Sequence, residues 1–379
     1  MPSSRKIKTL IVDDSAMIRR VLSLGFSADP RIEVVGIASN AEDADGMIRE
    51  LKPDVITLDI ELPGMNGVDF MRQYLGKHPI PTLIISSHSP SGSSVAISAL
   101  EAGAVDVIEK PSAGLASGLS NIMGSICEAV VRATSSRVIP GRRMNKASQP
   151  ALMQADSVIS RWVFAIGSST GGVQALSRIL PMFPENSPGI VIVQHMPPGF
   201  TEKFAARLND TCQMTVHEAS DGDTVKRGKI LLAPGGTQHM KLRKYGALDY
   251  RVTLEEGDPV NFSCPSVDVL FDSVAKEAGM KCSAALLTGM GRDGAQGLLN
   301  IRQAGGATIG QDEESCVVFG MPRAAQECGA VQTVVSLEDI PSKLLGSIGP
   351  ANRETRKPNR AETTPISVRG NNRLSNRPA

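Results

Sequence analysis

The chain has 379 residues, enough for two domains that each bury a core of their own. A formal net charge of +1 gives no general attraction to nucleic acid, and an aromatic content of 3% argues against a stacking surface for single strands. The six cysteines lack the spacing of zinc or CxxC sites, which is typical of reduced thiols. No apolar stretch is long enough for a signal peptide or membrane span, so we expect a cytoplasmic protein that is not inserted in a membrane.

The first third of the chain alternates short apolar runs with amphipathic segments. The helices that this pattern predicts cover residues 16–26, 41–51 and 93–102. Such alternation is typical of βα units, in which helices cover both faces of a parallel sheet. We therefore expect a doubly wound α/β domain over residues 5–132.

Charged side chains follow three of the predicted strands of this domain. Asp13 and Asp14 close one apolar run, Asp59 closes the next, and Lys110 closes a later one. Parallel strands finish at one edge of their sheet, where ligands bind, so these side chains should meet there. Clustered carboxylates suit Mg²⁺, and with its charge screened Asp59 could attack a phosphoryl donor.

Four motifs of this region resemble the response-regulator receiver domain, which has a flavodoxin-like fold. They lie at residues 12–15, 58–67, 84–87 and 108–111. The resemblance implies that Asp59 is the phosphoacceptor, that Asp13 and Asp14 help it to hold Mg²⁺, that Ser86 supplies a hydroxyl to the phosphoryl group, and that Lys110 contacts that group. An acidic pair alone could equally be a solvated loop feature, but four motifs in order favour a phosphate-accepting site.

The pattern changes twice after the first domain. Residues 133–156 are small, polar and basic, which predicts a flexible linker. A second α/β pattern occupies residues 157–349, and within it residues 241–260 should form an antiparallel hairpin at the sheet edge. Residues 350–379 are rich in Arg, Asn, Pro and Ser and should be disordered.

A serine lies at a predicted tight strand-to-helix turn at the start of the second domain. Residues 167–171 match GxSxG, with Ser169 at its centre. A serine nucleophile requires a base and a group that orients the base. His195 follows a continuous apolar strand and is the preferred base, with His239 as second choice, and Asp293 in a glycine turn is the preferred acid. Each signal is weak alone, but three such features at parallel strand ends favour a Ser-His-Asp triad.

The chain order Ser, His, Asp differs from that of α/β-hydrolases, so the GxSxG match does not place the domain in that fold. Instead, residues 158–348 resemble the catalytic domain of the CheB family of chemotaxis protein-glutamate methylesterases. The matching motifs lie at residues 166–172, 194–197, 233–236 and 287–295. The resemblance implies a Rossmann-like parallel sheet, with Ser169 as nucleophile, His195 as general base, Asp293 as the acid that orients it, and the Met290 backbone N–H as oxyanion donor.

The same resemblance implies a phosphorylation-activated enzyme that hydrolyses glutamyl methyl esters on chemoreceptors, releases methanol and deamidates receptor glutamines. A histidine kinase would then be the phosphodonor, and Mg²⁺ would be the cofactor of the receiver. The esterase would need no cofactor. We expect a monomer. Two alternatives remain open. The second domain could only bind a partner, with the serine turn as an anion site at a helix N-terminus, or the chain could control transcription, which only its basic linker and tail favour.

Overall fold

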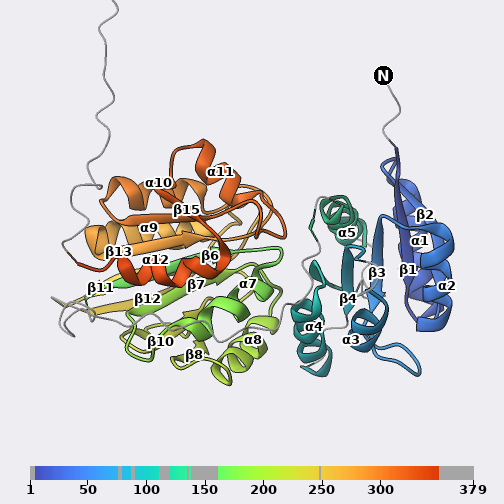
Figure 1. Ribbon diagram of the computed structural model, residues 1–379, viewed down its shortest axis with the longest axis horizontal. Helices are drawn as coiled ribbons and strands as arrows, with labels where there is room; N and C mark the ends of the chain where they lie inside the picture. Colours follow the sequence, from blue (N-terminus) through green and yellow to red (C-terminus); the bar gives the residue numbers. More distant parts are fainter. Residues whose placement is uncertain are drawn as a thin grey trace, which may run out of the picture.

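The computed structural model describes residues 5–75, 79–86, 90–110, 119–134, 136–137, 161–246 and 249–349. The described chain forms two α/β domains (Figure 1). Most of the predicted linker and all of the predicted tail lie outside the described residues.

The N-terminal domain is built on five parallel strands in the order β2-β1-β3-β4-β5. This is the flavodoxin-like order, as expected. The strands are β1 (Ile7–Val12), β2 (Ile32–Ala38), β3 (Val55–Asp59), β4 (Thr82–Ser86) and β5 (Asp106–Glu109).

Helices cover both faces of this sheet because successive strand residues point to opposite sides. Ile11 packs in the core under α1 and α5, whereas Leu10 and Val12 pack under α2, α3 and α4. Ser15 and Asn40 cap the first two helices by accepting hydrogen bonds from backbone amides. The helices are α1 (Ala16–Ala28), α2 (Ala41–Leu51), α3 (Gly67–Phe70), which continues as a short π-helix (Met71–Leu75), α4 (Pro90–Ala102) and α5 (Leu119–Ala133).

The C-terminal domain is built on seven parallel strands in the order β15-β14-β13-β6-β7-β10-β8. The central strands β6, β13 and β7 are fully buried, as their continuous apolar runs predict. The strands are β6 (Val163–Ser168), β7 (Gly189–Gln194), β8 (Thr215–Glu218), β10 (Lys229–Leu232), β13 (Cys282–Leu286), β14 (Ala307–Gln311) and β15 (Thr333–Val335).

Both faces of the larger sheet are also covered, which confirms the doubly wound prediction. Phe164 and Ile166 of β6 pack with α7 (Gly172–Ile179), α8 (Phe200–Asn209) and α12 (Ile340–Gly346). Val163 and Ala165 point to the opposite face of the sheet. They pack with α9 (Val267–Ala278), α10 (Ala295–Gln303) and α11 (Met321–Glu327).

The predicted hairpin forms, but its predicted place at the edge of the main sheet is wrong. β11 (Gln238–Tyr245) pairs with β12 (Asp249–Glu256), and the two join β9 (Thr224–Val225) in a separate three-stranded sheet. Met240, Leu242 and Val252 have no exposed surface and belong to the core under α9. The hairpin therefore buries an apolar face against the domain instead of extending the main sheet.

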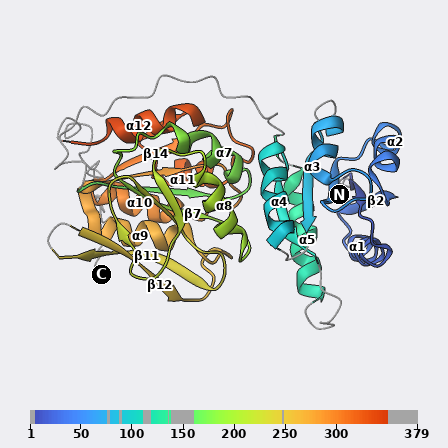
Figure 2. The ribbon, with the colours of Figure 1, turned by 90° about the horizontal axis from the view of Figure 1, so that it is seen from below.

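The two domains meet through helix α4, which lies against α7 and α8 (Figures 1 and 2). Buried apolar residues of the two domains belong to one continuous cluster. The helices in the described segments are each too short or too polar to span a bilayer.

Candidate functional sites

Three carboxylates converge at the end of strands β1 and β3. One oxygen from each of Asp13, Asp14 and Asp59 lies within 4.8 Å of the others. Lys110 Nζ lies 2.7 Å from Asp59 Oδ2 and 3.1 Å from Asp13 Oδ2. The predicted meeting of these side chains at one sheet edge is thus observed.

Burial sets the electrostatics of this acidic site. Asp59 is 2% exposed, and burial raises its pKa to about 6, although Lys110 opposes that rise. Ser86 is also buried and ends the neighbouring strand, where its carbonyl accepts a 2.8 Å hydrogen bond from the Lys110 amide. Ser86, Lys110 and the carboxylates therefore lie at the ends of adjacent strands.

The acidic site fits a hard divalent cation. Asp13 Oδ2 is buried and, within the described segments, accepts no hydrogen bond; its close neighbour is the Lys110 ammonium. Asp14 is exposed, so a cation held by the three carboxylates would keep access to solvent. Mg²⁺ prefers oxygen ligands and usually keeps several water molecules in its coordination shell.

The second site begins at the turn between β6 and α7. The Ser169 amide donates to the Thr288 carbonyl at 3.0 Å, which ties this turn to the end of β13. A side chain at Gly172 would place Cβ 1.9 Å from Gln194 Oε1, and one at Gly289 would place it 2.8 Å from Ser169 Cβ. Only glycine allows these three segments to approach so closely.

Gln194 connects the serine turn to the histidine turn. Its Nε2 donates 3.0 Å hydrogen bonds to the carbonyls of Ser169 and His195, and its Oε1 accepts from Ser168 Oγ at 2.7 Å. Ser168 is therefore a structural residue beneath the site. The sequence analysis assigned no role to Gln194, although the residue precedes His195 directly.

His195 and Asp293 form a close pair. His195 Nε2 lies 2.9 Å from Asp293 Oδ2, so the other ring nitrogen, Nδ1, faces away from the acid. Within the described residues, Nδ1 contacts Ser263 Oγ at 3.4 Å, and no hydrogen bond joins it to Ser169. Ser169 and His195 nevertheless line the same small hollow.

Asp293 lies at the N-terminus of helix α9 and is held there as an anion. Its oxygens accept hydrogen bonds from Ser266 Oγ at 2.7 Å, the Val267 amide at 2.7 Å and the Asp268 amide at 3.1 Å. Burial favours the protonated acid, but His195 and these donors outweigh it and keep the pKa of Asp293 below its usual range. The imidazole therefore faces a fixed negative charge.

His239, the second-choice base, has a structural role. It is 4% exposed, its Nδ1 accepts a 3.1 Å hydrogen bond from the Ser266 amide, and its Nε2 bonds the Asp258 carbonyl at 3.0 Å. It supports the cap of α9 and so acts on Asp293 only indirectly. The turn at residues 234–237 that precedes His239 shows nothing of this role, because the contacts of His239 come from residues 258 and 266.

The receiver covers the serine site. Thr170 Oγ1 lies 3.4 Å from Asp106 Oδ2, and Gln174 donates to the Ala104 carbonyl at 3.1 Å. The hollow between them is about 10 Å³, which leaves room for about one water molecule. Burial raises the pKa of Asp106. A substrate cannot reach Ser169 through this hollow while the domains are in contact.

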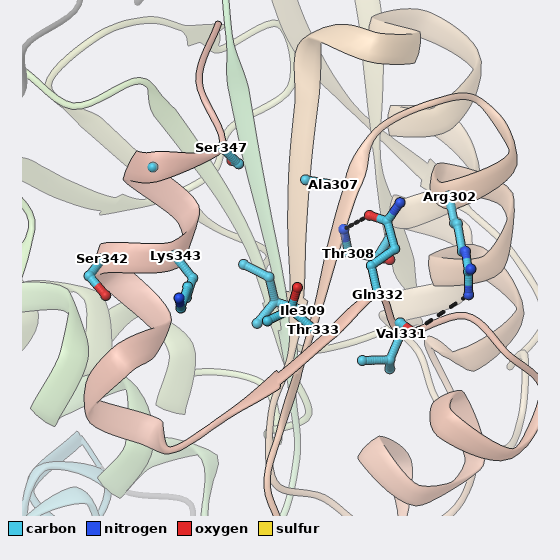
Figure 3. Close-up of a pocket in the computed structure, with 11 residues that line it drawn as sticks. Arg302, Ala307, Thr308, Ile309, Val331, Gln332, Thr333, Ser342, Lys343 and Ser347 are labelled. Carbon is cyan, nitrogen blue, oxygen red and sulfur yellow. Dashed lines mark hydrogen bonds between the residues drawn. The ribbon is translucent and has the colours of Figure 1, made fainter. Parts of the chain in front are cut away.

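A larger hollow of about 590 Å³ lies elsewhere in the catalytic domain (Figure 3). Ala307 and Thr333, which line it, begin strands β14 and β15, so it lies at the sheet edge opposite the strand ends that carry Ser169 and His195. Arg302 and Gln332 in its wall already hydrogen-bond to the backbone. None of the predicted catalytic residues lines it.

The fold and the two sites define a two-domain protein with a receiver-type acidic site and an output domain that brings Ser169, His195 and Asp293 to one sheet edge. Residues 9–116 match the response regulator receiver domain, and residues 164–344 match the CheB methylesterase family. The chain belongs to the CheB family of response regulators.

Curated relatives span the chain. A protein-glutamate methylesterase/protein-glutamine glutaminase 2 of Cereibacter sphaeroides is 52% identical over 340 residues, which cover 90% of this chain and 92% of the relative. A protein-glutamate methylesterase/protein-glutamine glutaminase of Syntrophotalea carbinolica is 43% identical over 350 residues, which cover 90% of this chain and 97% of the relative. The crystal structure of the Thermotoga maritima CheB methylesterase catalytic domain is 42% identical, covers 50% of this chain and 100% of that one, and has a TM-score of 0.48.

Proposed function

We propose that this protein is a phosphorylation-activated serine hydrolase that demethylates glutamyl methyl esters on chemoreceptors and deamidates receptor glutamines. The observation that carries the proposal is the 2.9 Å pair of His195 and Asp293 beside Ser169. The relatives named as methylesterase/glutaminase support the substrate class. Ester and amide differ only in the group that leaves.

In the first half of the reaction, Ser169 Oγ attacks the ester carbonyl carbon. Asp293 accepts a hydrogen bond from the Nε2–H group of His195, which leaves the Nδ1 lone pair free to take the serine proton. Charge then develops on the carbonyl oxygen. The Met290 amide is suited to stabilise it, because it donates no hydrogen bond within the described residues and adjoins Gly289, whose backbone lies against Ser169.

In the second half, the proton on His195 Nδ1 passes to the leaving oxygen, and methanol departs from the acyl-Ser169 ester. Water then attacks that ester with His195 again as base, which returns free Ser169 and a glutamate carboxylate. With a glutamine substrate the same proton reaches nitrogen, and ammonia leaves. No cofactor is needed for either reaction.

In the receiver, we propose that Asp59 accepts the phosphoryl group from a histidine kinase or a small phosphodonor. Asp13, Asp14 and Asp59 would hold Mg²⁺, which supplies charge neutralisation during the transfer. Lys110 and Ser86 would contact the phosphoryl oxygens from the ends of the neighbouring strands. Phosphorylation would then favour separation of α4 from the catalytic domain and open the serine site.

The test is methanol release from receptor membranes that carry labelled methyl esters, incubated with the full chain in the presence and absence of a phosphodonor. We expect slow release without the phosphodonor and faster release with it, and no release by Ser169→Ala. If Ser169→Ala retained the rate, or if the protein bound the membranes without releasing methanol, the second domain would be a binding module instead.

A further inference from the structure

Phe262 is a fully exposed aromatic residue in a chain that buries most of its phenylalanines. Its relative exposure is 103%, whereas seven of the nine phenylalanines have almost no exposed surface. A single exposed apolar residue is unremarkable by itself. The backbone that presents Phe262 to solvent is what distinguishes it.

Phe262 sits in a tight two-residue turn. Val260 and Ser263 exchange two backbone hydrogen bonds of 3.0 Å, and the residues between them have φ values of 50° at Asn261 and 65° at Phe262. Positive φ at both central positions is the requirement of a type I′ turn, which prefers Asn followed by Gly. The chain thus keeps a phenyl ring at the position that glycine would occupy with less strain.

The same turn is fixed to the catalytic pair on both sides of Phe262. Asn261 Nδ2 donates to Asp293 Oδ1 at 3.2 Å and to Asp268 Oδ2 at 2.7 Å. Ser263 Oγ lies 3.4 Å from His195 Nδ1. The residue before Phe262 therefore contacts the acid and the residue after it contacts the base, so the ring must stand at the rim of the site.

The ring is exposed although the receiver covers Ser169. It is therefore accessible before the domains separate. Met290, on the loop that carries Asp293, is also partly exposed at 42%. The rim thus offers apolar contacts beside a polar catalytic centre.

We propose that Phe262 is a specificity residue that packs against apolar side chains of the polypeptide segment carrying the methylated glutamate. This inference rests on the function proposed above. The occupant is a protein segment and not the ester group alone, because the ring points to solvent from the rim and no contact places it among the reacting atoms. Phe262 should therefore distinguish a protein substrate from a small ester.

The test compares two substrates with the full chain, a small phosphodonor and Mg²⁺: methyl-labelled receptor membranes, and the γ-methyl ester of a glutamate blocked at both ends. The variants are Phe262→Gly, which suits the positive φ, and Phe262→Leu, which keeps an apolar side chain. The control is Tyr245→Ala, since Tyr245 is a 54% exposed aromatic residue about 20 Å along β11 from His239.

We expect the ratio of kcat/KM for the receptor to kcat/KM for the small ester to fall about tenfold in Phe262→Gly, through KM, with a melting temperature no lower than wild type. The same ratio in Phe262→Leu should stay within about threefold of the wild-type value, and the ratio in Tyr245→Ala should equal the wild-type value.

An equal fall for both substrates would mean that Phe262 acts on His195 through the turn, and an unchanged ratio would mean that it makes no substrate contact; either outcome overturns the inference. Failure of the proposed function would look different, because the wild type itself would then release no methanol from the receptor, whether or not it hydrolysed the small ester.

Discussion

Arg207 Nε on helix α8 donates a 2.8 Å hydrogen bond to Glu101 Oε1 on helix α4, and thereby joins the catalytic domain to the receiver. A second guanidinium nitrogen pairs with the other oxygen of Glu101. Arg207 also donates a hydrogen bond to the Ser98 hydroxyl, and the Ser177 hydroxyl donates one to Glu101. These polar contacts join helix α4 of the receiver to helices α7 and α8.

Loss of this pair should raise the basal activity of the unphosphorylated chain. Both side chains are partly exposed, and such pairs contribute about 0.2–1 kcal/mol, so Arg207→Ala should increase the open fraction and the rate by about 1.4- to fivefold. The matched control is Arg243→Ala, which breaks an ion pair with Glu255 on the hairpin. An initial rate of methanol release that is equal in Arg207→Ala and the control would contradict a latch at α4.

Ser169→Ala and His195→Gln should each remove almost all esterase activity, and the double variant should lose no more than either. Nucleophile and base act in one step, so their losses do not add. Asp293→Asn should retain more activity than either of these variants, since Asp293 orients the base and does not itself react. The measurement is single-turnover hydrolysis with circular dichroism as a fold control. Independent, additive losses would argue against a shared mechanism.

The acid should also make the catalytic domain sensitive to low pH. Because the folded-state pKa of Asp293 lies below the ordinary 3.8, the stability that its ionised form contributes is complete above that pH and is lost as the pH falls through the folded pKa. Melting temperatures of wild type and Asp293→Asn should therefore differ at neutral pH and converge in acid. A gap of constant size down to the acid unfolding of both proteins would count against this assignment.

Phosphodonor stimulation should depend on Asp59 alone. Asp59→Asn keeps the shape of the side chain but cannot form an acyl phosphate, so it should abolish the stimulation and preserve the basal rate. A chelator should have the same effect on the wild type if Mg²⁺ occupies the three carboxylates. Glu61→Gln, two residues further along the chain, serves as a control. Stimulation that survives Asp59→Asn would place the phosphate on another residue.

Sequence patterns predicted the parts of this structure that depend on local order. Strand ends carry Asp59, Ser169 and His195 where apolar runs stop, and the glycine turn before Asp293 is visible in the sequence. These features follow from the periodicity of apolar residues and from turn chemistry, both of which act over a few residues. They are sufficient to bring the candidate groups to the right sheet edges.

The contacts that hold these groups in place were not predictable in the same way. Ser266 could have been recognised as a helix cap before an apolar run, but nothing nearby indicates that the capped helix end receives Asp293. Glu101 and Arg207 are 106 residues apart, and each belongs to an ordinary amphipathic helix. Their pairing depends on how two finished domains pack, which no local pattern encodes.

Strand β5 is shared by both sites. Its first residue, Asp106, touches Thr170 beside the serine, and Lys110, one position beyond its end, touches Asp59, the proposed phosphoacceptor. Four strand residues span about 13 Å, and β5 is an edge strand bonded only to β4 in its sheet. A shift of this strand would reach both sites at once.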